Sequence, residues 1–153
     1  METIYFIMPR KISDSFAEIV KKATENCQLT IVKTTEDLLA LKNKKIIFAF
    51  VLDEYGFDIP SFKMLLKLKE SGDNFLLDSR AIIIIQSSNE LFTKSTAQKI
   101  ILLTSQIGCR FPGHSVVEAT DNLNNFHTLQ KTFNLLLSEI YKKHAKELVK
   151  KLT

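Results

Sequence analysis

Residues 44–52 read KKIIFAFVL, and this stretch decides how the rest of the sequence is interpreted. Its last seven residues are all apolar and rich in β-branched and aromatic types, without the polar alternation of a strand that faces water on one side. Such a run is typical of a strand buried on both faces, because helices on both sides of a parallel sheet exclude water from it. The pattern therefore predicts a central strand of a parallel sheet.

Apolar runs of the same kind lie on either side of this stretch. IYFIM at residues 4–8 and AIIII at 81–85 predict two more buried strands, and weaker candidates lie at 28–32 and within 110–119. The segments between them carry apolar residues at helical spacing or residues typical of helix ends. The expected helices run from a cap at Ser15 to about Asn26, over 36–41, from Pro60 to about Ser71, over 93–107 before Gly108, and over 124–151 as one helix or two.

The predicted elements alternate between strand and helix along the whole chain. This alternation is typical of an α/β protein with a parallel sheet and helices on both faces. Five strands fit the doubly wound, flavodoxin-like arrangement, a three-layer sandwich with strand order 2-1-3-4-5. At 153 residues, the chain is expected to form a single domain over 1–153.

Composition argues against several classes of function. Apolar residues make up 45% of the chain and charged residues 25%, as in folded globular proteins rather than disordered ones. The apolar runs are far shorter than the roughly 20 residues of a membrane helix, and Met1-Glu2-Thr3 lacks the basic start of a secretory signal. A cytoplasmic protein without a membrane partner is therefore expected. Only three of the 21 basic residues are Arg, which argues against nucleic acid as a partner, because base readout favours Arg.

The sequence offers no constellation for metal binding or nucleophilic catalysis. Cys27 and Cys109 form neither a disulfide framework nor a zinc motif and are expected to pack as small apolar residues. The histidines, His114, His127 and His144, are too widely spaced for a short metal motif. Neither a nucleophile elbow nor a glycine-rich phosphate loop occurs. We therefore assign no side chain as catalytic or as a metal ligand.

Three loops should meet beyond the carboxyl ends of the strands, where sheets of this kind bind ligands. They cover residues 9–15, 53–60 and 86–92. The first opens a helix, whose N-terminus attracts anions, and it adds two cations and two hydroxyl groups: Arg10, Lys11, Ser13 and Ser15. This is a candidate phosphate site. The alternative is that Ser15 only caps its helix and the cations are solvated, and Asp14 would repel a phosphate.

The second loop presents Tyr55 and Phe57 around Gly56. Aromatic rings beside an anion site suit a flat ring ligand that stacks on them, and glycine permits close approach of the backbone. The alternative is that both rings pack back on the protein. Asp53 also ends a strand where a receiver domain carries its phosphoacceptor, but the acidic cluster that a receiver needs is replaced by Pro9-Arg10-Lys11.

These loops resemble those of the NAD(P)H-dependent FMN reductase branch of the flavodoxin-like proteins. The similar stretches are PRKISDS at 9–15 and EYGFDIPSFK at 54–63, with GCRFPGHSVVEATDNLNNF at 108–126 similar to a C-terminal segment of that family. Pro9, Arg10, Lys11 and Ser15 fall on the family's first loop, and Glu54, Tyr55, Pro60 and Lys63 fall on its segment after the third strand.

The resemblance implies FMN as the cofactor, and it assigns a part of FMN to each loop. The phosphate would be held by Arg10, Lys11, Ser13 and Ser15, and the ring would be flanked by Glu54, Tyr55, Gly56 and Phe57. The far edge of the ring would meet Ser87, Ser88 and Asn89.

The implied function is an FMN-binding oxidoreductase that uses NAD(P)H as co-substrate to reduce a flavin, a quinone or a similar small-molecule acceptor. Members of the family are often homodimers, so a homodimer is expected, and light scattering would test it. The alternative is a flavodoxin-like domain that has lost flavin and acts as a binding or interaction module. Ile7 and Met8, which replace the family's Gly-Ser, and the glycine-poor loops favour this alternative.

Overall fold

The computed structural model describes residues 2–24, 27–38, 41–72, 74–88, 91–111 and 115–120. Strands and helices alternate along them as the sequence predicts. The elements are β1 (Glu2–Ile7), α1 (Asp14–Ala23), β2 (Cys27–Val32), α2 (Thr35–Leu38), β3 (Lys45–Val51), α3 (Ile59–Glu70), β4 (Arg80–Ser87), α4 (Thr93–Ser105) and β5 (Val116–Thr120).

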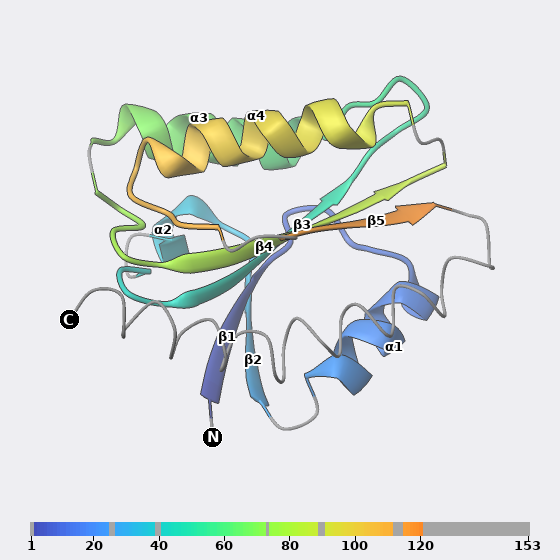
Figure 1. Ribbon diagram of the computed structural model, residues 1–153, viewed down its shortest axis with the longest axis horizontal. Helices are drawn as coiled ribbons and strands as arrows, with labels where there is room; N and C mark the ends of the chain where they lie inside the picture. The colour runs from blue at the N-terminus through green and yellow to red at the C-terminus, as the bar shows by residue number, and fades with distance from the viewer. Residues whose placement is uncertain are drawn as a thin grey trace.

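The five strands of this described part form one parallel sheet in the order β2-β1-β3-β4-β5. This confirms the predicted class and strand order. Helices α3 and α4 lie together on one face of the sheet, and α1 lies on the other (Figure 1). The strand order reverses between β1 and β3, so the loops that follow these two strands leave the same edge next to each other.

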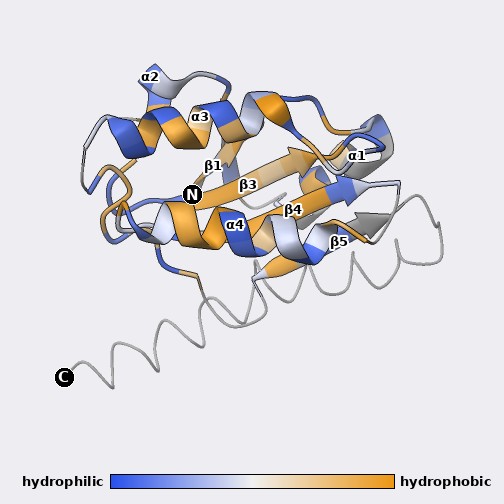
Figure 2. Cartoon of the chain, turned by 90° about the horizontal axis from the view of Figure 1, so that it is seen from above, coloured by the Kyte–Doolittle hydropathy of each residue, from blue (hydrophilic) through white to orange (hydrophobic). Residues whose placement is uncertain are grey.

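The central strands are buried on both faces, which explains their uninterrupted apolar runs. On β3, Phe48 and Phe50 belong to the hydrophobic cluster beneath α3 and α4, while Ile47 and Ala49 belong to the cluster on the α1 face. Figure 2 shows hydrophobic residues along both β3 and β4. Burying a large apolar side chain stabilises a fold by roughly 1.5–3 kcal/mol, so these two strands fix the register of the sheet.

The start of α1 differs from the expectation. The helix begins at Asp14, and its first backbone bond runs from the N–H of Ala17 to the oxygen of Ser13, at 2.9 Å. The N-cap position therefore falls to Ser13, and the prediction that Ser15 caps this helix is wrong. The physical reason is a hydrogen bond between Ser13 and β4, described below, which no local pattern reveals.

The ends of three other elements also differ. β4 continues to Ser87 because its pairing with β5 extends that far, so the loop expected from residue 86 begins after Ser87. α4 ends at Ser105, and Gly108 follows with a φ of +95°, a conformation that favours glycine. α2 (Thr35–Leu38) begins one residue before the helix expected over 36–41, and residues 39–40 of that helix lie outside the described residues.

Several expectations fall outside the described residues. They are the helix over 124–151, the three histidines and Asn89. Within the described residues, no helix is long and apolar enough to cross a membrane. The same residues contain no cluster of three or more His, Cys, Asp or Glu side chains that could hold a metal ion.

Candidate functional site

Two long-range hydrogen bonds bring the loop after β1 to the ends of β3 and β4. The guanidinium of Arg10 donates to the main-chain oxygen of Val51 at the end of β3, with an Nη1···O distance of 3.2 Å. The main-chain N–H of Ser13 donates to Oε1 of Gln86, near the end of β4, at 2.9 Å. Residues from three separate strands and their loops therefore meet at the carboxyl edge, at the right of the sheet in Figure 1.

The loop after β3 is closed by its own first residue, Asp53. The Oδ1 of Asp53 accepts the N–H groups of Tyr55 and Phe57, both at 2.9 Å. The N–H of Asp53 donates to the oxygen of Phe57 at 2.9 Å, and the N–H of Gly56 donates to the oxygen of Asp53 at 3.0 Å. These four bonds join residues 53–57 into one compact turn, and the turn sets the positions of both aromatic residues.

Gly56 packs this turn against the loop after β4. Its φ of +81° lies in the left-handed region that favours glycine. A Cβ added there would clash with Cγ of the Phe92 ring, which lies closer than real Cβ contacts allow. The open side of Gly56 is therefore occupied by the Phe92 ring.

Asp58 anchors the other end of the loop in the core. Its side chain is fully buried, and its Oδ2 accepts the N–H of Val51 at 2.9 Å and the hydroxyl of Ser61 at 2.8 Å. Its Oδ1 accepts the N–H of Ser61 at 3.2 Å, which makes Asp58 the N-cap of α3, with Pro60 in the first turn as predicted. The carboxylate compensates its burial with three donors and ties α3 to the end of β3.

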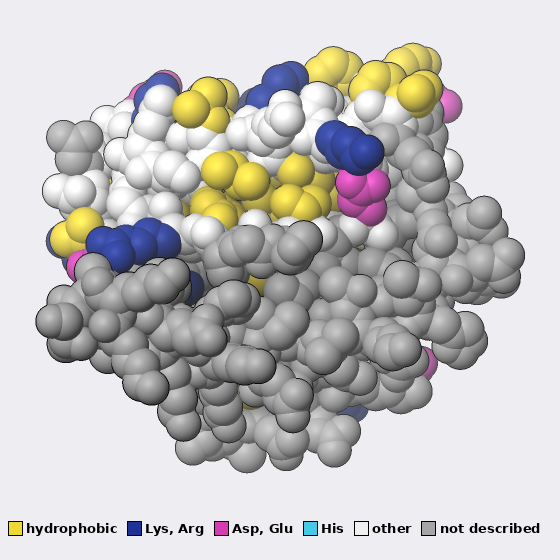
Figure 3. Space-filling model, viewed as in Figure 1, with side chains coloured by type: hydrophobic (Ala, Val, Ile, Leu, Met, Phe, Trp, Pro, Cys, Tyr) yellow, Lys and Arg dark blue, Asp and Glu magenta, His cyan; other side chains and the backbone are white. Residues whose placement is uncertain are grey.

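The two aromatic side chains of this loop are exposed. Tyr55 is 69% exposed and Phe57 is 56% exposed, so neither ring packs back on the protein. Ile59 and Leu91 are exposed as well, and Figure 3 shows hydrophobic side chains gathered at the upper right, over the loops that follow β3 and β4. Exposed rings held by a fixed turn are suited to stacking on a flat ligand.

The cations of the loop after β1 are exposed, and neither is committed to a buried partner. Lys11 pairs with Asp14 at 3.2 Å, and both side chains are almost fully exposed. A surface pair of this kind contributes about 0–1 kcal/mol, so Lys11 can exchange this partner for another anion. Between these cations and the helix, Ile12 is buried in the cluster on the α1 face and holds the loop down on the sheet.

The remaining predicted site residues differ in their exposure to solvent. Glu54 and Ser88 are exposed, and Ser15 lies in the first turn of α1. Ser87 is 2% exposed as the last residue of β4, so its expected role at the far edge of a flavin ring does not fit its burial. Asn89 lies outside the described residues.

Sequence reasoning missed three residues that hold the site together: Asp53, Asp58 and Gln86. Asp58 carries a local signal, since an Asp two residues before a Pro and three before a Ser is typical of a helix start. Asp53 begins a turn around a glycine, which is also a local signal. Gln86 carries none, because its partner Ser13 is 73 residues away in the chain.

The one buried thiol among the described residues is not a nucleophile. Burial raises the pKa of the Cys109 thiol from 9.0 to about 12, against a smaller lowering by its contact with the oxygen of Arg110. The thiol therefore stays protonated at neutral pH, which supports the expectation of a packing role.

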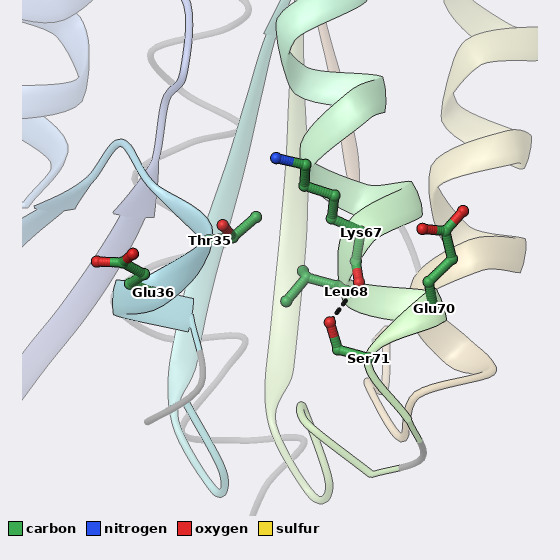
Figure 4. Close-up of a pocket in the computed structure, with 6 residues that line it drawn as sticks. All are labelled: Thr35, Glu36, Lys67, Leu68, Glu70 and Ser71. Atoms are coloured by element: carbon green, nitrogen blue, oxygen red, sulfur yellow. Dashed lines mark hydrogen bonds between the residues drawn. The ribbon is translucent and has the colours of Figure 1, made fainter.

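A hollow of about 240 Å³ lies between α2 and the C-terminal end of α3. It is lined by Thr35, Glu36, Lys67, Leu68, Glu70 and Ser71. In Figure 4 the two carboxylates point away from the ammonium group of Lys67, and the hydroxyl of Ser71 donates to the oxygen of Lys67 at 2.7 Å. Its polar groups do not converge on a common point, so the carboxyl edge remains the better candidate.

No model of a protein family matches this chain, and no curated protein sequence matches it. Solved structures do. The flavodoxin of Fusobacterium nucleatum bound to flavin mononucleotide is similar with a TM-score of 0.66 and 13% identity, over 94% of this chain and 99% of that one. The Trp repressor binding protein of Bacillus subtilis has a TM-score of 0.65 and 11% identity, over 90% and 99%. An NADH:FMN oxidoreductase in its apo form has a TM-score of 0.60 and 14% identity, over 91% of each chain. The chain therefore has the flavodoxin-like fold.

Proposed function

We propose that this protein binds FMN at the carboxyl edge of its sheet and uses it in an oxidoreductase reaction with NAD(P)H. The observation that carries the proposal is the exposed pair Tyr55 and Phe57, held by one closed turn beside the cationic loop after β1. A fold that is similar to an FMN-bound flavodoxin and to an NADH:FMN oxidoreductase supports it.

The residues present fit two parts of FMN. The aromatic rings offer flat apolar surface for the isoalloxazine ring, and Arg10 and Lys11 offer charge for the phosphate. The polar edge of the ring is served less well, because the N–H groups of Tyr55, Gly56 and Phe57 already donate to Asp53. We therefore expect stacking and charge, rather than backbone hydrogen bonds from this loop, to dominate the affinity.

Bound FMN would supply the hydride chemistry, so the protein needs no catalytic acid or base of its own. The protein would orient the flavin ring through Tyr55 and Phe57 and would hold the phosphate of FMN through Arg10 and Lys11. The specific reaction that we propose is reduction of a flavin, a quinone or a similar small acceptor by NAD(P)H. The proposal of this specific reaction rests on the resemblance of the loops 9–15 and 54–63 to those of the FMN reductase branch.

One observation favours a second candidate function, a binding module without flavin. The N–H groups of Tyr55, Gly56 and Phe57 all donate to Asp53, and the Phe92 ring fills the space that glycine leaves. A turn completed in this way can present its exposed rings to another protein as readily as to a cofactor. In that case Tyr55 and Phe57 would be contact residues of an interface.

Flavin titration separates the two functions. We expect the wild-type protein to quench FMN fluorescence on binding, and Tyr55→Ala to weaken the FMN affinity about tenfold through the lost stacking surface. Leu102→Ala is the matched control, because Leu102 is an exposed apolar residue on α4 that belongs to neither loop. A folded wild-type protein without affinity for FMN would exclude the reductase and leave the binding module. Oxidation of NADH and NADPH by the FMN-loaded protein then tests the proposed reductase reaction.

A further inference from the structure

Gln86 is the second-last residue of β4, at the carboxyl edge of the sheet. It pairs with Val51 across β3 and β4, and its main-chain oxygen accepts the N–H of Leu52 at 2.8 Å. Along β4 it follows Ile82 and Ile84 at every second position, on the sheet face that α1 covers. Its side chain can therefore reach the start of α1, where Oε1 accepts the N–H of Ser13 at 2.9 Å.

This bond supplies a capping interaction that α1 lacks within its own sequence. In a capping box, the side chain of the third helical residue accepts the N–H of the N-cap residue. The N-cap residue here is Ser13, and the third helical residue is Phe16, which has no side-chain acceptor. Gln86 takes over this function from a strand on the far side of β3.

The cap matters for an anion because it fixes the backbone at the start of the helix. The first N–H groups of a helix lack partners within the helix and point toward its N-terminal end, where they attract negative charge. Their direction depends on the orientation of the peptide at the N-cap, which the bond from Ser13 to Gln86 holds. The amide of Gln86 does this without adding a negative charge next to a phosphate.

We propose that Gln86 is a positioning residue of the flavin site. By accepting the N–H of Ser13, its side chain holds the start of α1 in the orientation that directs the first N–H groups of the helix toward the phosphate of FMN. The inference rests on the proposed function and deepens it. In this proposal Gln86 acts through Ser13 and needs no contact of its own with the ring or the phosphate. Its effect is therefore specific to flavins that carry the phosphate, and riboflavin, which has the same ring without it, does not depend on Gln86.

The test compares two ligands in two variants. Gln86→Met removes the acceptor at nearly constant size, and Gln28→Met is the matched control, because Gln28 is an exposed glutamine on β2. We expect Gln86→Met to weaken FMN binding about fivefold, as for loss of one neutral hydrogen bond, and to leave riboflavin binding within twofold of wild type. Gln28→Met should change neither affinity. Hydrogen exchange of the Ser13 amide should become faster only in Gln86→Met.

The outcomes are distinct. Equal loss of both affinities, or no change in either, would overturn the positioning function of Gln86 while the flavin site stands. An unchanged exchange rate at Ser13 would overturn it as well, because the bond would then not protect that amide. If the wild-type protein binds neither riboflavin nor FMN, the proposed flavin function fails, and this inference fails with it.

Discussion

The loop after β3 and the loop after β1 meet at the same edge of the sheet, but they are held in opposite ways. Residues 53–58 are closed by bonds among themselves and anchored by the buried carboxylate of Asp58. Residues 8–13 are held from outside, by Gln86 on β4 and by the contact of Arg10 with Val51. The ion pair between Lys11 and Asp14, at the start of α1, is exposed.

This difference divides the proposed site into a fixed part and an adjustable part. In the turn that carries Tyr55 and Phe57, four N–H groups donate within the turn itself, so its rings are presented in one arrangement before a ligand arrives. The loop after β1 keeps its charges in water and can change partners at little cost. A ligand with a flat ring and a charged end would meet a preorganised surface at the ring and an adaptable one at the charge.

The largest effect is expected from breaking the anchor of the fixed loop. Asp58→Ala leaves the N–H of Val51 and both donors of Ser61 without their acceptor in a buried place, and each such loss costs roughly 1–3 kcal/mol. We expect the free energy of unfolding to fall by about 4 kcal/mol in urea. Asp37→Ala is the control, since its one hydrogen bond, from Thr34, is exposed, and it should cost less than about 1 kcal/mol. A loss below about 1 kcal/mol in Asp58→Ala would contradict the anchoring function.

A smaller effect is expected inside the turn itself. Gly56→Ala meets both an unfavourable φ and the Phe92 ring, so we expect a loss of about 3 kcal/mol in stability. Gly72→Ala is the control, because Gly72 has a φ of +119° but no atom closer than 3.9 Å to the added Cβ. Gly72→Ala should lose only the free energy needed to place a side chain at positive φ, about 1–2 kcal/mol. Equal losses in the two variants by urea unfolding would mean that the contact with Phe92 contributes nothing.

The smallest effect on stability is expected in the adjustable loop, where the effect on binding is larger. Lys11→Ala should change the free energy of unfolding by less than about 0.5 kcal/mol, because its ion pair is exposed. The same change should weaken FMN binding about threefold at low salt and leave riboflavin binding unchanged. Asp14→Asn should have the opposite effect on affinity and strengthen FMN binding about twofold, because it removes an anion that competes with the phosphate. Equal responses of FMN and riboflavin to both variants would place the phosphate elsewhere.

Much of the fold was predictable from the sequence because its signals are local. The runs at 4–8, 44–52 and 81–85 predicted the three central strands, and the alternation of elements predicted the parallel sheet and its order. Pro60 in the first turn of α3 followed from the same kind of local pattern. These predictions hold because a buried strand and a proline in the first turn of a helix are marked by residues that are close together in the sequence.

The site was predictable only in part. The convergence of three loops followed from the topology, and the aromatic loop was identified, but its exposure was left open until the structure gave it. The local pattern predicts Ser15 as a helix cap and Ser87 as a loop residue, and both predictions are wrong. Ser87 lies in β4 because it pairs with Thr120 of β5, and a partner so distant in the chain leaves no signal in the local sequence.

By itself, the sequence determined the α/β class through its hydrophobic pattern and the closed turn around Gly56 through residues at most four positions apart. The order of the strands followed from the topology that this class favours. The tertiary structure decided where α1 begins, which side of Gly56 is filled and which side chain holds Ser13. Each of these depends on a contact between distant segments, Ser13 with Gln86 or Gly56 with Phe92. Such contacts exist only after the sheet has brought the ends of its strands together, so no local pattern in the chain encodes them.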